Sequence, residues 1–253
     1  MIGAMPPVTA IPSRVLDLAF PARCPGCGRE GPPICAGCAL ALDARMELPG
    51  GIAIGLPSDV PAPLLQLEWC APFSGLVRRA LHELKYGGET RLAMPLGEAI
   101  ARRWRRVAAG GDVLVPVPVH ADRARRRGYD QAELIAYAAG RRLGIPCAPV
   151  LERVRATIAQ FDLDRATRAT NVRGAFRLRP RPATGARAAT GPPVTVTGAR
   201  AIATASMVNP LAGRWVVLID DVVTTGATLS ACAEPLLAAG AIGVSAITVA
   251  RER

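Results

Sequence analysis

The chain has 253 residues, of which half are hydrophobic and 4% are aromatic, and its formal net charge is +11. That length accommodates one sizeable α/β domain with an appendage, and the hydrophobic content excludes a wholly disordered chain. The sequence shows neither a signal peptide nor an apolar run long enough to span a membrane, so we expect a cytoplasmic protein with reduced cysteines. The basic charge favours polyanionic partners, either diphosphates or nucleic acid.

Four of the seven cysteines form two Cys-x-x-Cys pairs near the start of the chain: Cys24 with Cys27, and Cys35 with Cys38. Four thiolates at this spacing predict a closed, tetrahedral structural zinc site. A redox dithiol is one alternative, but that motif normally stands alone in a βαβ unit. Disulfides are another, and they would need an oxidising compartment. The other cysteines, which are Cys70, Cys147 and Cys232, have apolar neighbours and are predicted to be small core residues.

Two helices are predicted next, over residues 74–86 and about 91–108. Lys85, at the end of the first helix, could reach a phosphate; the simpler interpretation is a solvated cation favoured by the helix dipole. The second helix carries four arginines around Trp104, a combination that could hold single-stranded nucleic acid by charge and stacking. A solvated helix face is the commoner outcome of such a pattern.

A buried strand is predicted over residues 112–119, where prolines end the sheet ladder. His120 follows, and then an arginine-rich stretch that leads to Asp130. Asp130 with Glu133 predicts an N-cap and capping box for a helix over 131–143. Because ligands of open parallel sheets bind at the carboxyl ends of strands, this stretch is a candidate phosphate-facing loop.

Residues 153–173 carry polar groups at irregular spacing, which fits neither a regular helix nor a strand. This pattern predicts a mobile basic flap that closes over an anion and excludes water, and a disordered arginine loop is the competing interpretation. Residues 178–213 are rich in Ala, Thr, Gly, Pro and Arg without periodicity, which predicts a flexible insertion.

The most informative stretch is residues 215–228. An apolar run of strand length leads to Asp220 and Asp221, and a turn rich in Thr and Gly then precedes a helical pattern over 229–239. Backbone N–H groups at a helix start bind phosphate, and carboxylates accept hydrogen bonds from sugar hydroxyls or help to hold a divalent cation. Neither a Walker loop nor a Rossmann fingerprint is present. We therefore expect a ligand with both a sugar and a phosphate.

This stretch resembles the ribose-phosphate signature of the type I phosphoribosyltransferases, which bind 5-phosphoribosyl 1-diphosphate (PRPP). Further motifs are Leu84-Lys85-Tyr86, Pro116-Val117-Pro118, Arg127-Gly128-Tyr129-Asp130-Gln131, and Arg153 through Gln160 with Arg168 and Asn171. With these motifs and the cysteine pairs, the chain resembles the ComF family of competence-associated, amidophosphoribosyltransferase-like proteins.

The resemblance implies an α/β fold, with an open, mostly parallel sheet flanked by helices as in type I phosphoribosyltransferases. A small N-terminal zinc-binding segment would precede it. We expect a helix and the four-cysteine segment over residues 1–48 and the phosphoribosyltransferase-like domain over 49–253.

The resemblance also implies the ligand contacts. The PRPP-binding residues would be Asp220, Asp221, Val222, Val223, Thr224, Thr225, Gly226, Ala227 and Thr228, with the two acids facing the ribose hydroxyls. The diphosphate loop and flap would comprise Lys85, Val117, Pro118, Val119, His120, Arg153, Arg155, Gln160 and Arg168. Structural Zn²⁺, and Mg²⁺ with PRPP, are the expected metals.

Three features depart from the family pattern. Asp130 stands where the family usually has Asn, and it adds negative charge near the expected diphosphate. Pro235 lies inside the predicted helix after the cradle and should kink it or remove a hydrogen bond. The insertion over 178–213 is not expected in the family.

Two functions follow from these observations. The first is Mg²⁺-dependent phosphoribosyl transfer to an unidentified acceptor, associated with DNA uptake and competence. The second is a non-catalytic factor in competence or recombination that binds single-stranded DNA, with a sensory or vestigial PRPP site. Competence and recombination proteins are further expected partners.

Overall fold

A four-stranded parallel sheet forms the centre of the molecule. The computed structural model describes residues 21–50, 60–107, 110–155, 174–180 and 211–252. The strands are β3 (Leu67–Pro72), β4 (Val113–Pro116), β7 (Trp215–Val223) and β8 (Gly243–Arg251), in the order β3-β8-β7-β4. Apolar residues line both faces of β7 and β8, as is typical of parallel strands covered on both sides.

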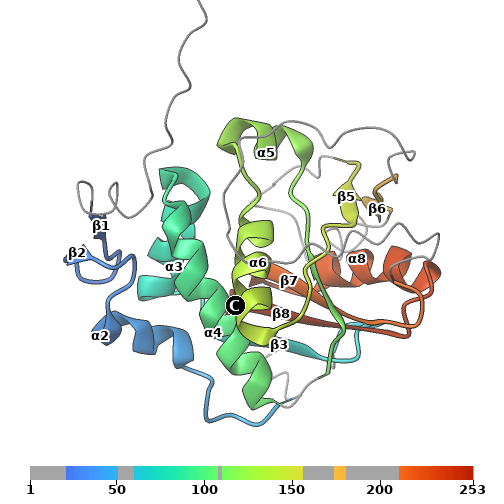
Figure 1. Cartoon of the computed structure of the whole chain (residues 1–253), viewed down its shortest axis with the longest axis horizontal. Helices are drawn as coiled ribbons and strands as arrows, with labels where there is room; N and C mark the ends of the chain where they lie inside the picture. Colours follow the sequence, from blue (N-terminus) through green and yellow to red (C-terminus); the bar gives the residue numbers. More distant parts are fainter. Residues whose placement is uncertain (1–20, 51–59, 108–109, 156–173, 181–210, 253) are drawn as a thin grey trace, which may run out of the picture.

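Helices cover the two faces of this sheet (Figure 1). On one face, α4 (Ala93–Arg106) and α6 (Gln131–Leu143) pack against each other and against Val217 and Ile219 of β7, forming what we call the α4/α6 core. On the other face, α8 (Ala227–Ala238) packs against alternate β7 residues and forms the α8 core. The predicted open, parallel α/β sheet flanked by helices is confirmed.

The N-terminal segment packs onto the α4/α6 side, where Figure 1 shows it in blue beside α3. Its elements are β1 (Ala22–Arg23), β2 (Glu30–Gly31), α2 (Ala36–Ala39) and the 3₁₀ turn η1 (Leu40–Asp43). Ile34 and Leu42 enter the α4/α6 core, and Arg102 of α4 binds Asp43 at 2.8 Å. The division at residues 48 and 49 stays a prediction, and the helix expected before the cysteines falls outside the described residues.

The predicted helix over 131–143 is confirmed as α6, and Asp130 is its N-cap. The helix expected over 74–86 divides into α3 (Gly75–His82) and a wide π turn, η2 (Glu83–Gly87). A 3₁₀ turn, η3 (Thr90–Leu92), leads into α4.

The arginine-rich stretch expected to form a loop is instead helix α5 (Ala121–Arg127). The His120 side chain accepts a hydrogen bond from the Asp122 backbone, which caps the start of this helix. Gly128 ends it in the left-handed conformation that glycine adopts easily.

A two-stranded antiparallel ribbon lies near α8, formed by β5 (Leu151–Arg153) and β6 (Phe176–Leu178). These strands flank most of the predicted flap, and residues 156–173 of that flap lie outside the described residues. The ribbon holds the first residues of the predicted insertion, since Arg179 N–H donates to Val150 O at 2.7 Å. Residues 181–210 also lie outside the described chain. None of the described helices combines the length and apolarity that a membrane crossing requires.

Candidate functional site

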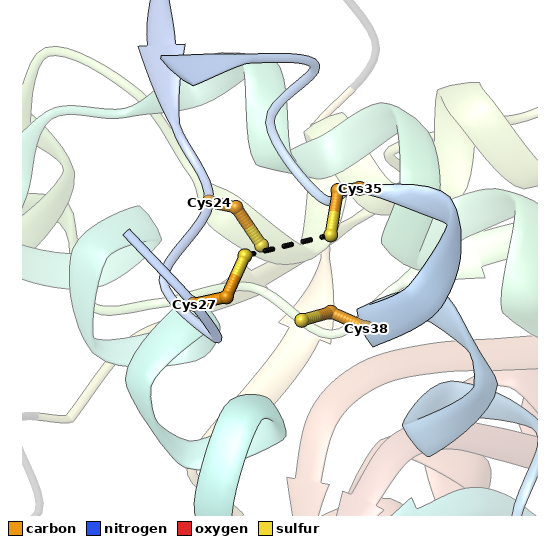
Figure 2. A group of neighbouring side chains, drawn as sticks. All are labelled: Cys24, Cys27, Cys35 and Cys38. Atoms are coloured by element: carbon orange, nitrogen blue, oxygen red, sulfur yellow. Dashed lines mark hydrogen bonds between the residues drawn. The ribbon is translucent and has the colours of Figure 1, made fainter. Parts of the chain in front are cut away.

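The two cysteine pairs come together in space. Figure 2 shows Cys24 and Cys27 on one side of the cluster, facing Cys35 and Cys38 on the other. The four Sγ atoms lie within 4.8 Å of one another, and Cys27 Sγ is 3.6 Å from Cys35 Sγ. Tetrahedral zinc with bonds of about 2.3 Å would place its sulfurs about 3.8 Å apart. The cluster therefore has the ligands and dimensions to bind a metal ion such as zinc.

The backbone around these cysteines favours the cluster. A Cβ atom at Gly26 would lie 2.6 Å from Cys38 Sγ, so this approach of the two pairs requires glycine. Burial raises the pKa of the Cys24 thiol, but backbone hydrogen bonds from Cys35, Cys27 and Gly26 outweigh it and lower that pKa to about 6. The side-chain hydrogen bond with Cys35 and burial instead raise the pKa of Cys38 to about 12, so the four thiols of the cluster differ. A thiolate is the form that binds metal.

The remaining cysteines differ from this cluster. Cys70 and Cys232 are buried in the core, as predicted, whereas Cys147 is partly exposed. Burial raises the pKa of the Cys70 and Cys147 thiols to about 12, so both favour the protonated form.

Asp220 and Asp221 approach the carboxyl edge of β7 from opposite faces of the sheet. The strand continues through both acids to Val223, and successive residues of a strand point in opposite directions. Asp221 shares the side of the α4/α6 core. Its Oδ2 accepts hydrogen bonds from Lys85 Nζ at 2.9 Å and Gln131 Nε2 at 3.2 Å.

Asp220 lies toward the other side, where its charge acts on the pKa values of Arg153 in β5 and Cys232 in α8. Burial raises the pKa of Asp220 well above its usual range, and the neighbouring charge of Asp221 raises it further. The backbone N–H of Asp221 donates to Asp220 Oδ1 at 2.8 Å and offsets part of this effect. Two acids with different surroundings therefore meet at one edge.

The π turn η2 brings Lys85 to this edge. Wide turns of this kind occur frequently at functional sites. The Tyr129 hydroxyl donates to Leu84 O and ties the turn to the segment before α6. Burial lowers the pKa of the Lys85 ammonium, but the charge and hydrogen bond of Asp221 outweigh it, so the pKa is raised. Lys85 is therefore a charged residue of the site, which its sequence position alone did not establish.

The segment after β4 forms the second part of the edge. Val117 N–H donates to Ile219 O at 2.9 Å, which aligns the segment with β7. Val119 N–H donates to Asp130 Oδ2 at 2.9 Å, while Asp130 Oδ1 caps α6. Burial raises the pKa of Asp130, and backbone hydrogen bonds, first that from Val119, oppose this shift. Asp130 thus fixes the loop, while Pro118 and His120 lie within the same stretch.

The turn between β7 and α8, where a phosphate cradle is predicted, depends on Gly226. Gly226 has φ +83°, and a Cβ there would lie 2.6 Å from Pro61 Cγ, so both conformation and space require glycine. Thr225 Oγ1 accepts a weak hydrogen bond from Ala227 N–H at 3.4 Å. The helix begins at Ala227, two residues earlier than predicted, and it contains Pro235 as expected.

The predicted flap is anchored at its first residue. Arg153 belongs to β5, and its guanidinium carbon lies 5.4 Å from the Phe176 ring centroid. Arg155 follows the strand. Gln160 and Arg168 lie outside the described residues, so their relation to the acids stays a prediction.

The structure overturns one interpretation of α4. Trp104 is 2% exposed and donates to Gly110 O, and Arg103 is 1% exposed. Trp104 therefore has no free face on which a base could stack, and the stacking interpretation is wrong. The exposed arginines of α4 are Arg105 and Arg106.

No protein-family model matches the chain. It is 28% identical over 228 residues to the DNA utilization protein YhgH of Salmonella typhi, covering 83% of this chain and 87% of that protein. It is 27% identical to YhgH of Escherichia coli K12, covering 87% and 85%, respectively. It is also 27% identical over 220 residues to competence protein F of Haemophilus influenzae, covering 85% and 84%. The resemblance to competence proteins predicted from the motifs is confirmed.

Among solved structures, the chain is similar to the glutamine PRPP amidotransferase from B. subtilis, with 22% identity and a TM-score of 0.34. The similarity covers 61% of this chain and 25% of that chain, so our protein spans about a quarter of that enzyme's length. The allosteric regulatory enzyme of purine biosynthesis gives a TM-score of 0.32.

Proposed function

We propose that this protein binds PRPP with Mg²⁺ at the shared carboxyl edge of β4 and β7 and acts as a phosphoribosyltransferase-like competence protein. One observation carries the proposal: the acids Asp220 and Asp221 lie beside a glycine-dependent turn that opens a helix, with the cation Lys85 at the same edge. Acids, cation and backbone donors match the hydroxyls and phosphates of one ligand.

In this proposal each part of the ligand meets a different element. The turn over 224–228 holds the 5-phosphate, and the two acids meet the ribose 2′- and 3′-hydroxyls. Lys85 and the loop over 117–120 face the diphosphate, together with Arg153 and Arg155. Mg²⁺ would help to neutralise the leaving diphosphate.

The reaction would follow from the charges at the site. Departure of diphosphate from the anomeric carbon leaves positive charge on the ribosyl ring, as in glycosyl transfer. The acids at the edge stabilise that charge, while the basic groups stabilise the leaving group. An acceptor nucleophile then forms the new bond to the same carbon.

Calorimetric titration with PRPP, with and without Mg²⁺, tests the binding proposal. We expect Mg²⁺-dependent binding by the wild type and none by Asp220→Asn/Asp221→Asn, because the amides cannot replace the carboxylate charges. Glu30→Gln/Glu98→Gln removes two acids outside the site and should bind as the wild type does. Equal binding by all three proteins would refute the sugar-facing role. Release of diphosphate with a panel of bases, amines and nucleotides tests turnover.

We further propose that the metal of the four-cysteine cluster is structural zinc. The cluster offers four sulfurs and no oxygen ligand, which suits a closed zinc site. Protein purified without chelators should contain about one zinc per chain. Cys27→Ser/Cys38→Ser should lose it, whereas Cys147→Ser should keep it. Retention of zinc by the double variant would contradict this assignment.

A second candidate function, single-stranded DNA binding, is favoured by α5. Arg123, Arg125 and Arg126 are exposed on this helix, and the relatives named for DNA utilization add support. Fluorescence anisotropy with an oligonucleotide should show binding that weakens steeply with salt. Replacing these three arginines by glutamine should weaken it more than the charge-matched control, in which Arg105, Arg106 and Arg141 are replaced. Equal losses would show that α5 is not the contact.

A further inference from the structure

We propose that Lys85 exchanges partners when ligand binds: it neutralises Asp221 beforehand and then moves to the diphosphate of PRPP, which releases Asp221 to the ribose. Lys85 would thereby make the site select ribose phosphates that carry a diphosphate. The inference rests on the proposed PRPP function and adds a determinant of specificity to that site.

The Asp221 carboxylate already has two donors within the protein. Lys85 Nζ and Gln131 Nε2 both contact its Oδ2, at 2.9 and 3.2 Å. The Asp221 side chain is 8% exposed and that of Lys85 21%, so the pair is largely withdrawn from water. A sugar hydroxyl that reaches this carboxylate must compete with an ammonium ion already bound there.

Breaking such a pair is unfavourable unless the cation gains another anion. A buried charge that loses its partner keeps the cost of desolvation without the attraction that offset it. A diphosphate supplies that second anion, and ribose 5-phosphate does not. The ion pair between Lys85 and Asp221 therefore weakens the binding of ribose 5-phosphate, whereas PRPP can replace it.

Lys85 has the freedom that an exchange requires. Its ammonium carries three donors on a flexible stem, unlike a planar guanidinium held in a bidentate pair. It projects from η2, a single wide turn that is followed by Gly88 in the left-handed conformation. The side chain can turn from one anion to another at the same edge without movement of the sheet.

Asp221 keeps its orientation when Lys85 leaves. Arg127 Nη1 donates to Gln131 Oε1 at 2.7 Å, which fixes the amide with its Nε2 toward Asp221. Gln131 is therefore a positioning residue that holds the carboxylate, and Lys85 is the partner that exchanges. Gln131 is held in place by Arg127, whereas Lys85 projects on a flexible side chain, and this difference gives the two residues different roles.

The first test compares Lys85→Met with the wild type by calorimetry, using PRPP and ribose 5-phosphate at constant Mg²⁺. We expect PRPP binding to weaken roughly ten- to a hundredfold, the range of a hydrogen bond to a charged group. Ribose 5-phosphate should bind as well as before or more tightly, because its competitor is gone. Arg78→Met, an exposed cation of α3, is the control and should leave both affinities unchanged. An equal loss for both ligands, or no loss for either, would overturn the proposal.

A second measurement uses the wild type and is independent of how the variant folds. Lys85 is the only lysine in the chain, so isotope-labelled lysine reports on this residue alone. PRPP should shift the side-chain resonances of Lys85, whereas saturating ribose 5-phosphate should leave them in place. Calorimetric PRPP binding without a lysine shift would overturn the exchange and leave the proposed function intact; no PRPP binding at all would reject both.

Discussion

Two carboxylates of the same sheet are neutralised in different ways. Glu68 of β3 binds Arg103 at 2.7 Å, and the two side chains are 0% and 1% exposed. Asp221 of β7 binds Lys85 at 2.9 Å with more of each side chain reaching solvent. Both are ion pairs between a strand and a neighbouring helical element. Their surroundings differ, and we expect one pair to be structural and the other to open when ligand binds.

Arg103 is committed to several partners at once. It donates to Glu68 through Nε and Nη2 and to the carbonyls of Arg45, Leu48 and Pro49. This arrangement joins the N-terminal segment to the edge strand and leaves no room for exchange. Lys85 instead holds one carboxylate oxygen from a flexible stem. The number of attachments therefore distinguishes a structural ion pair from one that a ligand can open.

The largest effect expected from this difference is that of Arg103→Met. The substitution leaves Glu68 buried beside fewer donors and removes the donors from three carbonyls, so we expect a loss of about 3–5 kcal/mol in the free energy of unfolding. Urea-induced unfolding measures it. Arg105→Met, on the exposed side of the same helix, should change stability by less than about 0.5 kcal/mol. Similar values for both variants would show that the buried cluster is not structural.

The sequence predicts the local parts of both candidate sites. The spacing of four cysteines predicts the cluster, and the order of strand, turn and helix is found in β7 and α8, although the strand continues through the two acids to Val223. Asp130 caps α6 as its position indicates. These features depend on neighbouring residues, which is why motif spacing predicts them.

The long-range parts could not be predicted in the same way. The strands β3 and β8 were not assigned from the sequence, and with β3 its buried Glu68 was missed. Arg103 could have been found, since it lies three residues after Ile100 and seven after Leu96, on the apolar face of α4. The pairing of Lys85 with Asp221 joins residues distant in the chain, and only the packed sheet brings them together.

Lys85→Met should destabilise the fold less than Arg103→Met does. Asp221 is buried but keeps Gln131 as a donor, so we expect a loss of about 1–3 kcal/mol. Lys85→Met/Asp221→Asn should recover part of it, because no buried charge then remains at that position. Denaturant unfolding of both variants measures the difference. A loss equal to that of Arg103→Met would mean that the Lys85 pair is as structural as the Glu68 pair.

The smallest expected effect on the free energy of unfolding is that of Asp220→Asn. This substitution should stabilise the fold, whereas the two described above should destabilise it. Burial and the charge of Asp221 raise the pKa of Asp220 in the folded state, so its ionisation at neutral pH costs stability. Asp220→Asn removes that cost, while its Oδ1 can still accept from Asp221 N–H. We expect Asp220→Asn to raise the free energy of unfolding near pH 8. The gain should shrink as the pH falls through the raised folded pKa and vanish below the unfolded value, near about pH 4. Thermal unfolding across this range measures the trend. A gain in stability from Asp220→Asn that is independent of pH, or a loss of stability, would mean that ionisation of Asp220 does not destabilise the folded state.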